Sequence, residues 1–107
     1  MRPVEFQILL SLADGARHGY AILQDMEARA EGAGSVETGT LYRALQRLVE
    51  QDFVRPARPP RTTIEEDQRR QYYALTAEGR RAASAEARRM AALVSSARAA
   101  KLIPRES

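Results

Sequence analysis

Residues 38–51 carry a varied group of hydrogen-bonding side chains on one side of a predicted helix. The opposite side is aliphatic, because four residues recur at the spacing of helical turns: Leu41, Ala44, Leu45 and Leu48. The polar side presents donors and acceptors of several kinds: Thr40, Tyr42, Arg43, Gln46 and Arg47. Arginine pairs with guanine edges or phosphate, glutamine pairs with adenine, and hydroxyl groups bond to phosphate. The pattern favours a helix that contacts DNA, with an ordinary solvated face as the alternative.

Two residues at the margins of this polar side have a second explanation. Tyr42 flanks the aliphatic side, so packing against the core suits its position as well as a hydrogen bond to phosphate does. Glu50 could accept a hydrogen bond from cytosine, although solvation of the helix end explains it more simply. The sequence therefore leaves the individual contacts of this helix open.

A second group of arginines lies in the region that follows the helix. Residues 53–55 and 71–75 have the composition of short strands, and the prolines between them exclude a helix. Arg61 and Arg69 fall in or beside the loop at 58–68, which could lie along the DNA backbone or in the minor groove. An exposed flexible loop is the alternative. Three acidic residues support that alternative by partly cancelling the charge: Glu65, Glu66 and Asp67.

The elements that would position these side chains form a recognisable plan. Apolar spacing predicts helices over residues 4–13 and 19–31, with a turn at Asp14–Gly15 between them and a break at Gly32–Ser35. Three short helices with brief connections match a helix-turn-helix, and the two strands with their basic loop add a wing. The expected fold class is mainly α with an α+β wing, that is, a winged helix-turn-helix.

A final helix is predicted after Thr76, which can cap its first turn. A narrow stripe of small and apolar side chains runs along it: Ala83, Ala87, Met90, Val94 and Ala97, with Leu93 alongside. Pro104 marks the end of any helical segment. The stripe cannot bury itself, so it should pack against the rest of this chain or against a second subunit.

Composition excludes several classes of function. The chain has 107 residues, a formal charge of +3, no cysteine and one histidine, His18. Disulfide frameworks, thiol catalysis, cysteine-ligated zinc and a histidine triad are therefore not expected, and neither a metal nor a cofactor is predicted. No segment has the apolar length of a membrane span or the pattern of a signal peptide, so a cytoplasmic location is expected. His18 is better explained as a residue at a helix start than as a ligand or a pH switch.

Three segments together resemble the PadR family of bacterial transcriptional regulators. They are HGYAI at 18–22, GTLYRALQRL at 39–48 and RRQYYALTAEGR at 69–80, in the order and spacing typical of that family. The similarity extends from about Val4 to Ala100 and is closest to the compact members with a single C-terminal helix. Two short stretches depart from the family pattern. Glu37–Thr38 replaces a frequent Ser-Pro before the third helix, and Asp52 replaces a frequent glycine after it.

The resemblance implies a homodimeric repressor that binds double-stranded DNA at a pseudo-palindromic operator. Residues 1–75 would form the DNA-binding domain, and residues 76–107 the dimerisation helix and tail. The dimer interface would use the first and last helices: Phe6, Ala87, Met90, Leu93, Val94 and Ala97. A small-molecule effector is known for some relatives, but no residue here indicates its identity. The main alternative is a winged-helix module that binds another protein, whereas an enzyme lacks support from any recognisable motif.

Overall fold

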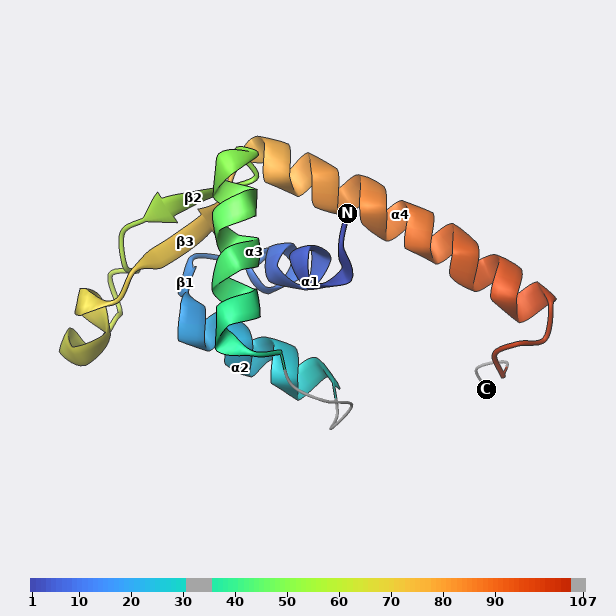
Figure 1. Ribbon diagram of the computed structural model, residues 1–107, viewed down its shortest axis with the longest axis horizontal. Helices are drawn as coiled ribbons and strands as arrows, with labels where there is room; N and C mark the ends of the chain where they lie inside the picture. Colours follow the sequence, from blue (N-terminus) through green and yellow to red (C-terminus); the bar gives the residue numbers. More distant parts are fainter. Residues whose placement is uncertain (31–35, 105–107) are drawn as a thin grey trace.

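The computed structural model describes residues 1–30 and 36–104, and Figure 1 shows a group of helices with a small sheet at one side. The helices are α1 (Pro3–Ser11), α2 (Gly19–Ala30), α3 (Thr38–Glu50) and α4 (Ala77–Ala99). The strands are β1 (Arg17–His18), β2 (Val54–Ala57) and β3 (Tyr72–Leu75), and a 3-10 helix, η1 (Glu65–Arg69), lies between β2 and β3. The expected break at 32–35 and the tail at 105–107 lie outside the described residues. The winged helix-turn-helix prediction is confirmed.

The core lies where α1, α2 and α3 meet. Its buried members are ten aliphatic or small residues: Ile8, Leu9, Leu12, Ile22, Met26, Leu41, Ala44, Leu45, Leu48 and Val54. The four α3 residues predicted as an aliphatic side are all among them, each at most 1% exposed. Burying one side of each helix removes apolar surface from water, which is the main stabilising contribution in a domain of this size.

The sheet is antiparallel with strand order β1-β3-β2. Val54 pairs with Leu75 and Pro56 with Tyr73, so β2 is longer than the segment predicted from composition. Pro56 is accommodated because β2 is an edge strand, where proline is tolerated at positions whose N–H would face solvent rather than the neighbouring strand. The two-residue strand β1 was not predicted, and it pairs Arg17 with Tyr73 and His18 with Tyr72.

The turn between α3 and β2 explains why aspartate can stand at position 52. Asp52 has a φ of 62°, in the left-handed region that ends many helices. The Phe53 N–H donates to the Leu48 carbonyl at 2.9 Å, and the Asp52 N–H donates to the Val49 carbonyl at 3.0 Å. These two bonds satisfy carbonyls that the end of α3 would otherwise leave unpaired. Aspartate tolerates this conformation better than most residues, so the departure from the glycine pattern leaves the turn intact.

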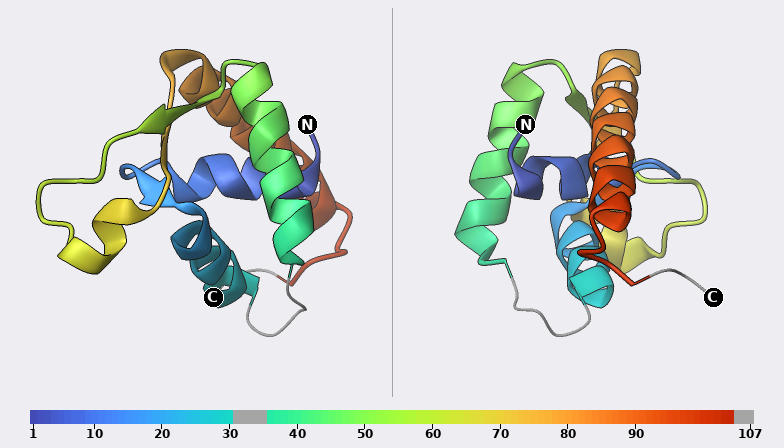
Figure 2. Two further views of the ribbon diagram at one scale, coloured as in Figure 1. Left: turned by 60° about the vertical axis from the view of Figure 1, so that its left-hand side comes forward. Right: turned by 90° about the vertical axis from the view of Figure 1, so that its right-hand side faces the viewer.

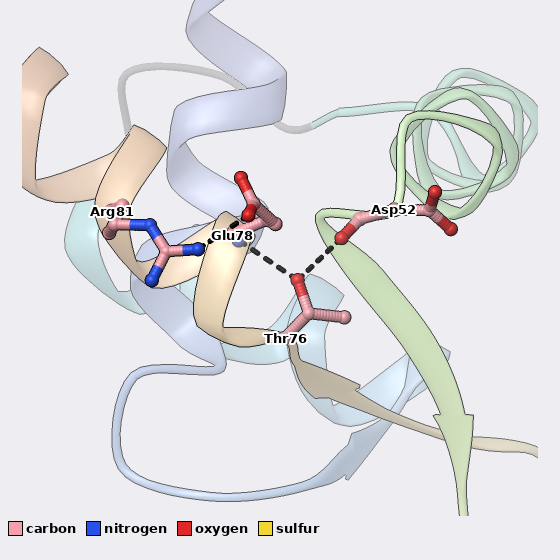
Figure 3. A network of polar contacts seen from close by, with 5 residues as sticks. Asp52, Thr76, Glu78 and Arg81 are labelled. Carbon is pink, nitrogen blue, oxygen red and sulfur yellow. Dashed lines mark hydrogen bonds and ion pairs between the residues drawn. The ribbon is translucent and has the colours of Figure 1, made fainter.

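The first turn of α4 is fixed against this same turn (Figure 3). The Thr76 hydroxyl donates to the Asp52 carbonyl and accepts from the Gly79 N–H. Gly79 is buried, and a Cβ there would lie 1.9 Å from the Phe53 carbonyl oxygen. The predicted Thr76 cap is therefore confirmed, and glycine is required at position 79 for the helix to start so close to Phe53.

Helix α4 then leaves the body of the molecule (Figures 1 and 2). Its first half lies beside α1, while its second half projects beyond it. The radius of gyration is 15.5 Å, with extents of 50 × 29 × 26 Å. A compact domain of this length has a radius of gyration of about 13 Å. Within residues 1–30 and 36–104, no helix combines the length and apolarity that crossing a membrane requires.

Candidate nucleic-acid interface

The solvent-facing side of α3 carries a straight line of residues along the helix. Gly39, Arg43, Gln46 and Glu50 are all exposed and recur at three- and four-residue spacing. The side chains of Arg43 and Gln46 project from the centre of this line, opposite the buried aliphatic side. The structure therefore places two of the predicted DNA contacts on the outermost part of the helix.

Arg43 and Gln46 make only weak bonds within the chain. Arg43 Nη2 donates to Thr40 Oγ1 at 3.4 Å, and Gln46 Nε2 donates to Glu50 Oε1 at 3.5 Å. Both distances are at the long limit for a hydrogen bond, and both pairs are exposed to water. Such bonds are easily exchanged, so either side chain can turn toward a ligand at little energetic cost. Thr40 is half-buried beside Arg43, on the flank that faces away from the wing.

Tyr42 lies on the opposite flank, next to the wing. Its side chain packs on Gly19, where an added Cβ would lie 2.4 Å from the tyrosine hydroxyl, yet the residue remains 45% exposed. Tyr42 and Gln46 also line a cleft of about 370 Å³ that is closed on the sheet side by Pro56 and Tyr73. Burial, with Tyr42 as a neighbour, raises the pKa of Tyr73. Tyr42 is thus a packing residue that still presents surface to solvent.

The position of Arg47 corrects an expectation from the sequence. Arg47 was expected on the outer side with Arg43, but it lies on the flank that faces α1. Its Nε donates to Glu5 Oε2 at 2.9 Å, and the two side chains are 33% and 8% exposed, respectively. Helical spacing gave the approximate direction of Arg47, but it could not show that an acidic residue of α1 lies on that flank.

The wing presents two arginines that are not engaged elsewhere in the fold. Arg61 and Arg69 are both exposed, and neither has a hydrogen bond or ion pair to any side chain that the structure describes. The acidic residues of the loop do more than cancel charge, because Asp67 forms an ion pair with Arg70 at 3.1 Å. The loop also contains the unpredicted helix η1 and a bond from Gln68 Nε2 to the Thr63 carbonyl at 3.2 Å.

The base of the wing is attached to the start of α2. The Arg70 guanidinium lies 5.6 Å from the centre of the Tyr20 ring, a cation–π contact. His18 makes an edge contact with Tyr72, with ring centres 5.4 Å apart, and its Nδ1 accepts from the Ala21 N–H at 3.1 Å. His18 is therefore the capping residue of α2, as its position in the sequence indicated. Burial and the nearby charge of Arg70 lower the pKa of His18, whereas Asp67 opposes this shift.

The predicted dimer residues fall into two groups. Phe6, Met90 and Ala97 are half-buried within this chain, while Ala87, Leu93 and Val94 are exposed. Leu93 is 57% exposed although it continues the side of α4 that packs on α1 nearer the start of the helix. Leu10 was not among the predicted residues, although it lies one turn after Phe6 on the outer side of α1 and is 40% exposed. The i, i+4 spacing of Phe6 and Leu10 was the available signal.

Comparison with solved structures identifies the same fold in several bacterial regulators. A transcriptional regulator from Clostridium thermocellum is 23% identical over 94% of this chain and 90% of its own, with a TM-score of 0.72. A PadR family regulator from Clostridium difficile is 22% identical over 89% and 94% of the two chains, with a TM-score of 0.75. Bacillus subtilis PadR, solved in complex with operator DNA, is 24% identical over 78% of this chain and 46% of its own, with a TM-score of 0.62.

The family assignment rests on the sequence itself. No protein with a curated description matches the chain. Residues 8–85 match the model of the transcriptional regulator PadR-like family, a segment that contains the last part of α1, all of α2, α3 and the wing, and the first part of α4. This is a family of non-enzymatic, DNA-binding regulators. The chain belongs to the PadR-like family of transcriptional regulators.

Proposed function

We propose that this regulator is a cytoplasmic homodimeric repressor that reads a pseudo-palindromic operator with α3 in the major groove. The observation that carries the proposal is the exposed line on α3, where Arg43 and Gln46 have only weak partners within the chain. The major groove is wide enough for one helix, and arginine and glutamine discriminate guanine and adenine there. Two such helices in a dimer would reach half-sites about one helical turn apart.

The proposed contacts divide by what they would recognise. Arg43 and Gln46 would read base edges, while Thr40 and Tyr42 would bond to phosphate from the two flanks of the helix. Arg61 and Arg69 would contact the backbone or the minor groove from the wing. Arg47 is left out of this set because Glu5 already holds its guanidinium.

The shape of the protomer supports dimer formation. Its accessible surface is 7661 Å². A compact monomer of this mass exposes about 5,900 Å², so roughly 1,700 Å² is in excess. A stable interface buries about 800 Å² on each partner. The projecting half of α4 accounts for the extended shape. Its exposed apolar side chains would pack with Phe6 and Leu10 of the second subunit. The proposed interface residues on α4 are Ala87, Met90, Leu93, Val94 and Ala97.

Release by a small molecule is a further part of the proposal. A cavity of about 390 Å³ lies between the start of α1, the α3–β2 turn and α4, with Phe53 and Glu86 among its lining residues. Its volume is within the range of small-molecule sites. A ligand there would contact both elements of the proposed dimer interface and could shift the population toward a form that does not bind DNA. Titration of the operator complex with phenolic acids tests this, and Ala85→Leu, which narrows the cavity, should abolish any release.

Fluorescence anisotropy tests the proposed function as a whole. The purified protein is titrated into DNA from upstream of its own gene and into a shuffled control, over a series of salt concentrations. A site-specific regulator should prefer the native DNA by about a thousandfold or more, with two chains bound per site. Equal and strongly salt-dependent binding to both DNAs would contradict operator recognition. Negligible binding to either would instead favour a module that binds another protein.

A further inference from the structure

The ion pair between Arg47 and Glu5 joins the DNA-reading helix to α1. Arg47 is in the last turn of α3, and Glu5 is in the first turn of α1. Their side chains meet at 2.9 Å although 42 residues separate them in the sequence. The Glu5 side chain is only 8% exposed, so the pair lies at the edge of the core rather than on the surface.

Both oxygens of the Glu5 carboxylate are occupied. Oε1 accepts from the Arg2 N–H at 3.1 Å, while Oε2 accepts from Arg47. Burial alone would raise the pKa of Glu5, but the bonds and charges of Arg47 and Arg2 outweigh it and lower the pKa below its ordinary value. The carboxylate is therefore charged at neutral pH, and a charged group in this position depends on its partner.

The ion pair restricts rotation of α3 about its own axis, which the apolar contacts of the helix restrict less strictly. Leu41, Ala44, Leu45 and Leu48 hold α3 on the core, but apolar contacts have no direction and permit small rotations about the helix axis. A hydrogen-bonded ion pair on one flank has a defined direction. Arg43 lies one turn before Arg47 on the same helix, so a rotation of α3 that the ion pair prevents would turn Arg43 and Gln46 together away from the direction in which they now face.

We infer that Arg47 is a positioning residue for DNA recognition, which acts through Glu5 to set the rotation of α3, and that it does not itself contact DNA. This inference rests on the proposed function, because it concerns how α3 reads an operator. The inference gives Glu5 a role in operator recognition, although this residue belongs to α1 and not to the exposed line of α3. It also predicts that two residues of opposite charge have effects of the same sign on operator affinity.

The test compares Arg47→Met, Glu5→Gln and the double variant with the wild type, on native and shuffled DNA over a salt series. If Arg47 positions α3, each single substitution should lower operator affinity about tenfold. The double variant should be no weaker than either single variant, because both remove the same interaction. Affinity for shuffled DNA and the salt dependence should stay close to those of the wild type. Circular dichroism below the melting temperature confirms that each variant is folded.

A direct contact between Arg47 and phosphate gives the opposite pattern. Arg47→Met would then weaken binding to both DNAs and reduce the salt slope by about one. Glu5→Gln would strengthen binding to both, because it releases a guanidinium toward DNA. Unchanged operator affinity in both single variants would also overturn the inference, since the ion pair would then be only structural.

An NMR measurement provides a readout that does not depend on affinity. The Nε–Hε signal of Arg47, assigned by its loss in Arg47→Met, should change in Glu5→Gln and remain unchanged when operator DNA is added to the wild type. A shift on DNA addition would overturn the inference. A wild type without preference for native DNA would overturn the proposed function, and the positioning role with it. That failure of the proposed function can be told apart from a failure of the positioning role, because it is measured on the wild type alone.

Discussion

The first turns of α3 and α4 each contain a glycine, and the surroundings of the two glycines differ. Gly79 of α4 is buried against Phe53, and a Cβ would lie 1.9 Å from a backbone oxygen. Gly39 of α3 is exposed, and the three nearest side-chain atoms to a Cβ there all belong to the flexible side chain of Arg43, the closest at 3.1 Å. The fold therefore requires glycine at the start of α4 but not at the start of α3. The first turn of α4 is thus packed against its own chain, whereas the first turn of α3 is open to a binding partner.

The largest expected effect is at Gly79. Gly79→Ala should destabilise the fold by about 3 kcal/mol, because the clash is with backbone and cannot be relieved by a side-chain rotation. Urea unfolding monitored by circular dichroism measures the change, with Gly39→Ala as the matched control. A loss below roughly 1 kcal/mol would show that α4 can start further from Phe53 than the structure indicates.

The second half of α4 should behave differently, because Leu93 there is 57% exposed. Leu93→Glu should leave the protomer folded but weaken dimerisation about thirtyfold, or ~2 kcal/mol, since it places a charge in the proposed interface. Analytical ultracentrifugation measures the dissociation constant. Ser95→Glu, on the outer side of the same helix, is the control and should have no such effect. Equal dimerisation of both variants would argue against α4 as the interface.

At Gly39, in contrast to Gly79, an added methyl group should affect DNA binding and not the integrity of the fold. Gly39→Ala should stabilise the free protein by about 0.5–1 kcal/mol, because alanine is the better helix former. The same methyl group should weaken operator binding by about 1 kcal/mol if DNA lies close to the start of α3. Thermal unfolding and anisotropy measure the two effects on one sample. A variant with higher stability and unchanged affinity would mean that DNA does not approach this turn.

The smallest effect concerns the start of α2, which His18 caps. Because the folded state lowers the pKa of His18, the unfolded state binds a proton first as the pH falls. The contribution of His18 to the free energy of unfolding should therefore be fully present above about pH 7, decrease as the pH falls through about 6.5, and stop changing below the folded pKa. His18→Asn keeps a capping side chain and should remove this pH dependence. Since His18 is the only histidine, an identical pH profile in the variant would contradict this account.

The sequence predicted the parts of the fold that depend on local periodicity. The buried side of α3, the Thr76 cap and the two longer strands follow from helical spacing and from residue preference. The two-residue strand β1 could not be predicted, because it is too short to show alternation and exists only through pairing with Tyr72 and Tyr73. Helix η1 was missed because a single turn rich in acidic residues has the composition of a loop.

The candidate site was predicted less completely, and Arg47 shows the reason. Helical spacing determines the side of a helix on which a residue lies, but the neighbour on that side comes from the tertiary structure. Glu5 gave no local signal, since a glutamate in the first turn of a helix is explained by the helix dipole alone. The exposed positions of Arg43 and Gln46 do not depend on a residue distant in the sequence, so helical spacing alone was enough to predict them.

The central claim is that the exposed line of α3 reads base sequence, and Arg43→Ala tests it most directly. The affinities of the wild type and the variant are measured by anisotropy on native and shuffled DNA at one fixed salt concentration. A base-reading role predicts a loss of about 1–3 kcal/mol on native DNA and little change on shuffled DNA, so that the preference between them falls at least several-fold. An equal loss on both DNAs would contradict the claim, because it would mean that Arg43 contacts only phosphate.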